Sequence, residues 1–312
     1  MRQRSGTTSS RVHWMILPLV AAACSSGAGA VAHGPPENRG DGVVVPADVD
    51  ASYLMYDRAK DRVLVQRNPD KAYRSASVVK ILIALDYLYS HGSWSDIPPK
   101  DLAALQSMLR SSDDDAANDF WDRAGQIAMV DRMAIKLELQ GIRRPANPDF
   151  WGHTAFTALD ILRIYRYLLD GPNDDFRRFV LDNIGMSTSC ATDGRDQYFG
   201  IPRAVHPPFR IKQGWSAFGD VPAGRECQPA APHAERPGVG TTAPPTTEPS
   251  PRTAPPPDID LKSRLLHTTG LVDQDQKILI VLTLHPRTTT WEDAATKITS
   301  VTQQVYTAGT RR

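Results

Sequence analysis

The hydrophobic pattern predicts strands at both ends of the chain and helices between them. Residues 52–56 and 62–66 are rich in aromatic and β-branched side chains on either side of a polar turn, which indicates a hairpin. Residues 265–269 and 278–284 predict two later strands, and the second is apolar almost throughout, as in the centre of a sheet. This order indicates an α+β domain whose sheet is assembled from both ends of the chain.

The middle of the chain has the apolar periodicity of helices. One helix is expected to begin at Ser77, and because residues 81–85 are apolar all round, it should run through the core. Thr157 and Asp160 form a capping-box pattern ahead of an apolar run that ends at Leu169. The same reasoning predicts helices over residues 101–110, from 113–115 onward, and over 127–139, 176–184 and 291–306.

Composition and charge exclude some function classes. The 312 residues suffice for one sizeable domain with additional segments. Lys+Arg 36 against Asp+Glu 35 leaves a formal charge of +1 without a basic block, so nucleic acid is not an expected partner. The eight histidines show no metal-ligand spacing, and we interpret His267 and His285 as structural. No metal or organic cofactor is implied.

Residues 1–24 have the features of an export signal. Three arginines precede an apolar core, Trp14–Ala23, of about ten residues, whereas about twenty are needed to span a bilayer. The small residues before Cys24 resemble a bacterial lipoprotein cleavage box, which predicts a lipid anchor at Cys24 and an outward-facing membrane lipoprotein. The alternative is cleavage after Ala32, which would discard Cys24 and release a secreted protein.

Two segments are not expected to contribute to a core. Residues 25–46 are rich in Gly, Pro and Ala and predict a flexible tether. Residues 228–258 contain ten of the 25 prolines together with many threonines, which predicts a disordered insertion. The folded domain would therefore cover residues 47–308, interrupted by that insertion.

Two cysteines remain once Cys24 is lipidated or removed. In an oxidising compartment Cys190 and Cys227 are expected to form a disulfide. Such a bridge contributes roughly 3–4 kcal/mol in the chain-entropy model. The alternative is a pair of unrelated buried thiols.

The most informative stretch is Ser77-Val78-Val79-Lys80. A spacing of three residues places the serine hydroxyl and the lysine amine on one face of a helix. Serine is a weak nucleophile at neutral pH, and a neighbouring amine in a desolvated site can take its proton. The alternative is a common tetrapeptide whose Lys80 simply extends to the surface.

Two further elements follow in order along the chain. Ser112-Asp113-Asp114 is similar to a Ser-Asp-Asn element, and Lys212-Gln213-Gly214, in the strand-like stretch 209–212, is similar to Lys-Thr-Gly. With Ser77-x-x-Lys80 they resemble the class A β-lactamases and penicillin-binding proteins, over roughly residues 50 to 307. The resemblance implies a β-lactamase/transpeptidase-like fold, with an antiparallel sheet from both termini and a helical subdomain.

The resemblance also implies roles for individual residues. Ser77 would be the nucleophile, activated with the help of Lys80. Ser112 would pass a proton to the leaving nitrogen, and Lys212 would raise the local positive potential; Ser111 is a rival to Ser112. The substrate would be bound by Asp114, Gln213, Gly214 and Trp215, with the backbone N–H groups of Ser77 and Trp215 as the oxyanion hole.

The chain departs from the family pattern at three places. Asp114 replaces an asparagine; it can pair with Lys80 and hold the proton on the amine, but an ionised acid cannot donate a hydrogen bond. Gln213 replaces a hydroxyl residue that meets the substrate carboxylate. The family's water-activating glutamate has no counterpart, because the only acid between residues 140 and 157 is Asp149.

These observations lead to three function hypotheses. The first is a serine acyl-transfer hydrolase that acts on cell-wall peptides or β-lactams, with slow deacylation. The second is a catalytically degenerate envelope protein that binds peptidoglycan peptide or a protein partner. The third is a structural envelope lipoprotein that uses the proline-rich segment as a spacer.

Overall fold

The computed structural model describes residues 42–172, 174–228 and 259–311. The expected signal segment, most of the expected tether, and the proline-rich insertion from residue 229 onward lie outside these residues. Within the described ranges, no helix has the length and apolar character needed to cross a membrane.

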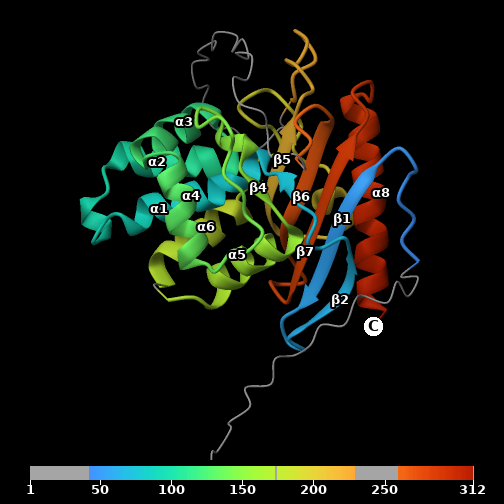
Figure 1. Ribbon diagram of the computed structural model, residues 1–312, viewed down its shortest axis with the longest axis horizontal. Helices are drawn as coiled ribbons and strands as arrows, with labels where there is room; N and C mark the ends of the chain where they lie inside the picture. Colours follow the sequence, from blue (N-terminus) through green and yellow to red (C-terminus); the bar gives the residue numbers. More distant parts are fainter. Residues whose placement is uncertain (1–41, 173, 229–258, 312) are drawn as a thin grey trace, which may run out of the picture. The chain divides into compact units, whose positions relative to one another are not determined.

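An antiparallel five-stranded sheet forms the centre of the domain, in the order β2-β1-β7-β6-β5 (Figure 1). Its strands are β1 (Asp50–Asp57), β2 (Arg62–Arg67), β5 (Arg210–Ser216), β6 (Arg264–Val272) and β7 (Lys277–His285). β1 pairs with β7 along its whole length, from Asp50 opposite Leu284 to Asp57 opposite Lys277. The sheet is therefore assembled from both ends of the chain, as predicted. A separate two-stranded sheet joins β3 (Tyr73–Arg74) to β4 (Ala155–Phe156).

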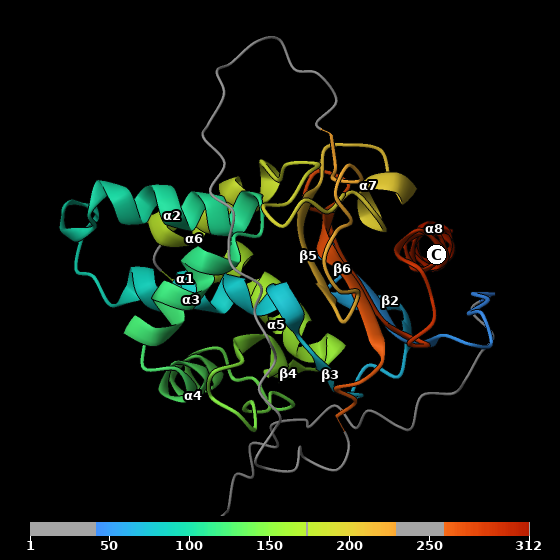
Figure 2. The same cartoon turned by 90° about the horizontal axis from the view of Figure 1, so that it is seen from above.

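The helices lie on the two faces of the sheet (Figure 2). They are α1 (Lys80–Tyr89), α2 (Pro99–Arg110), α3 (Asp114–Arg123), α4 (Ile127–Lys136), α5 (Ala158–Asp170), α6 (Asp174–Gly185), α7 (Ile201–Ala204) and α8 (Trp291–Thr310), with short 3-10 helices η1 (Ala76–Val79), η2 (Trp94–Asp96) and η3 (Trp151–His153). Side chains alternate along β7: Ile278 and Ile280 face the core shared with α1 to α6, whereas Leu279 and Val281 face α8. Each face of the sheet thus has its own core.

The local sequence explains where the helices begin and end. Nine of the ten residues of α1 are buried, in agreement with the apolar run that follows Ser77. At the start of α5, the Thr157 hydroxyl accepts a hydrogen bond from the Asp160 N–H at 3.0 Å and Asp160 accepts one from the Thr157 N–H, so the predicted capping box is present. α4 ends at Lys136, three residues earlier than predicted, because Glu138 adopts a positive φ of 54°.

Cys190 and Cys227 form a disulfide, with their Cα atoms 5.4 Å apart. The pairing expected from the oxidising compartment is present, and the alternative of two separate thiols is wrong. The bridge joins the segment before β5 to the segment after it and closes a loop of 37 positions. It therefore ties together the two ends of the segment that carries β5.

Candidate active site

Ser77 lies in η1, between β3 and α1, and only 5% of its surface is exposed. The residue before it, Ala76, has a φ of 44°, in a region that costs a non-glycine residue about 1 kcal/mol or more. Backbone strain of this kind gathers at functional sites. Within the described part of the chain the Ser77 hydroxyl makes no hydrogen bond, so it is not committed to a structural contact.

Lys80 is fully buried, so its side chain does not extend to the surface. Its Nζ donates to the carbonyl of Ser112 at 2.7 Å and lies 3.4 Å from the Ser112 hydroxyl. It also forms an ion pair with Asp114, whose side chain is 62% exposed. The amine therefore contacts Ser112 and Asp114, and the expected contact with the Ser77 hydroxyl is not made, because the carboxylate at position 114 attracts the ammonium group.

Lys212, on β5, also contacts the Ser112 hydroxyl. Its Nζ lies 2.9 Å from the Ser112 Oγ, and its side chain is buried. Burial, together with the nearby charge of Lys80, holds the pKa of Lys212 well below its ordinary value. Ser112 therefore lies between two amines, whereas Ser111 accepts a hydrogen bond from Thr188 at 3.1 Å. Of the two rival serines, Ser112 occupies the site.

Gly214 allows β5 to pack directly against the turn that carries Ser77. A Cβ atom at this position would lie 2.8 Å from the carbonyl oxygen of Ser75, which is closer than Cβ contacts in real proteins. Only glycine fits without a shift of the backbone. The close approach brings the backbone of Trp215, the other expected oxyanion-hole donor, onto the strand beside η1.

Gln213 and the indole of Trp215 are engaged in contacts away from Ser112. The Gln213 amide donates to the carbonyls of Gln197 at 3.0 Å and Phe199 at 2.7 Å, and the Trp215 indole donates to Asp193. Side chains alternate along a strand, so a Lys212 that faces Ser112 directs its neighbour Gln213 to the opposite face of β5. The expectation that the Gln213 side chain meets a substrate carboxylate does not agree with this geometry.

Trp151, in η3, covers the amine of Lys80. Its ring centroid lies 4.7 Å from the Lys80 Nζ, and its indole donates to Asn118 at 2.7 Å. No pattern in the sequence placed Trp151 over Lys80. Asp149 is exposed, and its side chain has no hydrogen bond or ion pair to another described residue. Its side chain thus makes no hydrogen bond or ion pair with Ser77, Lys80 or Ser112.

His267 is a structural residue, as predicted. It is buried, and its ring nitrogens contact the backbone carbonyls of Arg74 and Leu266 at 2.9 and 2.8 Å. Burial lowers its pKa to about 4, so the ring is neutral at physiological pH. In the described ranges, no group of three or more His, Cys, Asp or Glu side chains is arranged to hold a metal ion.

Solved structures share this fold. The chain is similar to a mutant of PBP-A, solved as an acyl-enzyme complex with penicillin G, at a TM-score of 0.55 and 12% identity, over 85% of this chain and 92% of the other. It is similar to a class A β-lactamase from Mycobacterium abscessus at a TM-score of 0.53 and 14% identity, over 83% and 93%. The chain thus has the fold of class A β-lactamases and penicillin-binding proteins, as the motifs predicted.

Comparison of sequences identifies a particular relative. The chain is 35% identical over 169 residues to "Putative lipoprotein LppW" of Mycobacterium tuberculosis and of Mycobacterium bovis, over 53% of each chain. The chain therefore spans about half the length of the curated relatives it matches. No family model matches the chain.

Proposed function

We propose that the chain is a serine acyl-transfer hydrolase in which Ser77 is acylated by a cell-wall peptide or by a β-lactam that mimics it. The observation that carries this proposal is the Ser112 hydroxyl, which lies 2.9 Å from the amine of Lys212 and 3.4 Å from that of Lys80. A hydroxyl between two amines is equipped to move a proton.

During acylation, Ser112 and Lys212 would carry the proton that Ser77 loses. The Ser77 oxygen bonds to the substrate carbonyl carbon, and the backbone N–H groups of Ser77 and Trp215 stabilise the oxyanion that forms. The Ser77 proton would pass through the Ser112 hydroxyl to the amine of Lys212, whose pKa burial lowers. As the carbon–nitrogen bond breaks, Lys212 would return the proton to Ser112, and the Ser112 hydroxyl would donate it to the leaving nitrogen. We assign the base to Lys212 because burial weakens its hold on a proton, whereas Asp114 pairs with Lys80.

Labelling with a fluorescent penicillin tests this function. Wild-type protein should form a covalent band that persists on a denaturing gel, and Ser77→Ala should form none. Absence of a band in the wild type, with the protein shown to be folded, would favour the second hypothesis. That hypothesis is a non-catalytic protein that binds peptidoglycan peptide or a partner protein.

The second hypothesis is favoured by one observation, the ion pair between Lys80 and Asp114. An ionised carboxylate occupies the Lys80 amine through this ion pair and cannot donate a hydrogen bond to a substrate. In an enzyme, Asp114→Asn should therefore free the Lys80 amine as a second base beside Ser112, in addition to Lys212, and raise the acylation rate by on the order of 10²-fold, the lower end of what a positioned base contributes.

Stopped-flow acylation of wild type and Asp114→Asn measures this effect. Asp115→Asn is the matched control, because Asp115 is exposed on the same first turn of α3 and should leave the rate unchanged. Equal acylation rates in wild type and Asp114→Asn would show that the carboxylate of Asp114 does not slow acylation.

We also propose that the protein is exported and anchored to the membrane through a lipid on Cys24. The export signal in residues 1–24 and the name of the mycobacterial relative support this location. Metabolic labelling with an alkyne fatty acid should mark the wild type and not Cys24→Ala. A secreted, unlabelled wild-type protein that begins at residue 33 would instead support cleavage after Ala32.

A further inference from the structure

A cavity of about 590 Å³ lies between the start of α8, the loop after β5, and the segment around residues 194–196. None of the residues that line it belongs to the group formed by Ser77, Lys80, Ser112 and Lys212. This volume falls within the range of small-molecule binding sites. The side chains that line it include four arginines, among them Arg195 and Arg264, and two aromatic residues, Phe218 and Trp291.

Arg195 is a buried cation without an acidic partner. Only 8% of its surface is exposed, and its guanidinium lies 4.6 Å from the Trp291 ring centroid and 5.8 Å from that of Phe218. It donates to the carbonyl of Gly219 at 2.5 Å. In the described part of the chain, no carboxylate lies within ion-pair distance of it. A buried charge of this kind is costly unless an anion compensates it.

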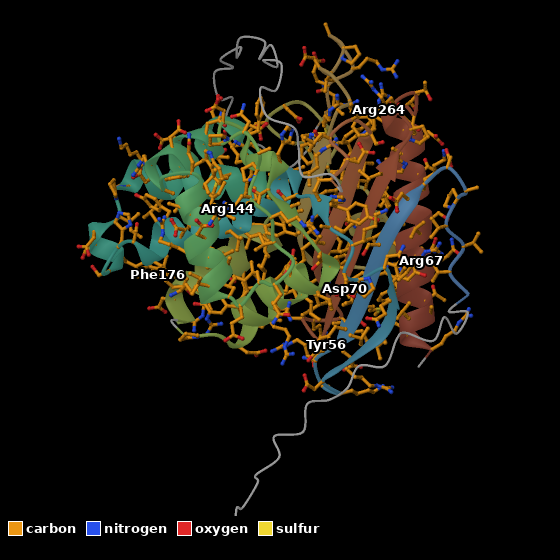
Figure 3. The ribbon with its side chains drawn as sticks, in the orientation of Figure 1. Tyr56, Arg67, Asp70, Arg144, Phe176 and Arg264 are labelled. Carbon is orange, nitrogen blue, oxygen red and sulfur yellow. A yellow bond between two sulfur atoms is a disulfide. The ribbon has the colours of Figure 1, made fainter. Side chains whose placement is uncertain are left out.

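Arg264, the first residue of β6, also packs against the Phe218 ring. Figure 3 labels Arg264 at the end of the sheet. Its guanidinium is 5.3 Å from the Phe218 centroid and donates to the carbonyl of Thr289. Among the described residues it has no carboxylate partner either. Because both guanidinium groups lie within 6 Å of one ring, they are close enough for their charges to repel.

The acidic side chains near the cavity form no ion pair with Arg195 or Arg264 in the described residues, although the charges of Asp193, Asp220 and Glu292 favour the cation of Arg195 from a longer distance. Asp196 forms an ion pair with Arg203 at 2.7 Å. Glu292 is exposed and lies 3.9 Å from Arg225, and Asp220 is exposed on the loop after β5. These acids are exposed or already paired, so the two guanidinium groups keep hydrogen-bond donors that no carboxylate of the described residues occupies.

We propose that this cavity is a second binding site, separate from Ser77, for a small ligand that carries an oxyanion and an apolar group. The carboxylate or phosphate of the ligand binds between Arg195 and Arg264, whose planar guanidinium groups suit such oxygens. The apolar group packs against Phe218 and Trp291. This site goes beyond the acyl-transfer function and does not depend on it.

Calorimetric titration of the full-length protein with 3-phenylpropanoate tests the proposal, and 3-phenylpropanamide is the neutral match. The carboxylate should bind in the millimolar range or tighter, and the amide should bind at least about tenfold more weakly, the size of a lost charged hydrogen bond. Competition with inorganic phosphate distinguishes the two sources of an oxyanion. If phosphate displaces 3-phenylpropanoate, the site also accepts phosphate. If phosphate does not displace it, the site is specific for a carboxylate. Binding of neither anion overturns the proposal.

Substitutions of single residues test whether 3-phenylpropanoate binds in this cavity. Arg264→Gln should weaken binding of 3-phenylpropanoate by at least about tenfold. Arg203→Gln is the matched control, since Arg203 lines the same cavity but is paired with Asp196, and it should bind like the wild type. Ser77→Ala should also bind like the wild type. Unchanged binding in Arg264→Gln, or loss of binding in Ser77→Ala, would overturn the assignment to this cavity.

Discussion

An acyl-enzyme at Ser77 is expected to hydrolyse slowly. After a rapid burst of about one equivalent, turnover of a chromogenic cephalosporin should be roughly 10²–10⁴-fold slower than with a positioned water-activating base, because no such base lies at the site among the described residues. Stopped-flow absorbance resolves the burst from the steady state.

Asp149→Asn is the control for this expectation. Asp149 is the only acid between residues 140 and 157, but its side chain is exposed and makes no contact with the described residues of the site. The variant should therefore show the same burst and the same slow phase as the wild type. A slow phase that disappears in Asp149→Asn, or rapid multiple turnover by the wild type, would reveal a base that this geometry does not position.

Lys212→Met is expected to abolish acylation and to stabilise the fold. The variant removes the proposed proton acceptor next to Ser112, so acylation should fall by roughly 10²–10⁴-fold. It also removes a buried amine whose charged form is disfavoured by desolvation and by Lys80. A buried apolar side chain of similar length should therefore raise the free energy of unfolding.

The pH dependence of this stabilisation follows from the lowered pKa of Lys212. Between that pKa and 10.5, the unfolded chain binds more protons at this residue than the folded chain, so wild-type stability rises with pH. The increase in the free energy of unfolding caused by Lys212→Met should be largest at low pH and should vanish near pH 10.5. Urea unfolding across the pH range measures it. Lys262→Met, at a lysine outside the site, should change neither stability nor acylation, and a destabilised Lys212→Met would contradict the account.

Sequence periodicity was sufficient to predict the elements that build the sheet. The run 278–284 identified β7, and the apolar residues after Ser77 identified α1, because both are buried on all sides. The two-residue strands β3 and β4 were not predicted, since so short a pattern carries no period. The disulfide was predictable from the number of cysteines and the compartment.

The sequence predicted that the residues of the three motifs would lie close together, but it did not predict the contacts that they make. The three motifs brought Ser77, Lys80, Ser112 and Lys212 to one region, since the fold places η1, the start of α3 and β5 side by side. The direction of the Gln213 side chain could have been inferred from strand alternation beside Lys212. The place of Trp151 over Lys80 could not, because it depends on how a segment without periodic structure packs against η1.

The central claim is that Ser77 is the acylated nucleophile, and peptide mapping by mass spectrometry tests it most directly. The protein would be incubated with a penicillin, quenched in acid and digested, with Ser77→Ala treated in parallel. The account predicts a single adduct on Ser77 in the wild type and none in the variant. An adduct on Ser75 or Ser112 with Ser77 unmodified, or the same adduct in Ser77→Ala, would contradict it.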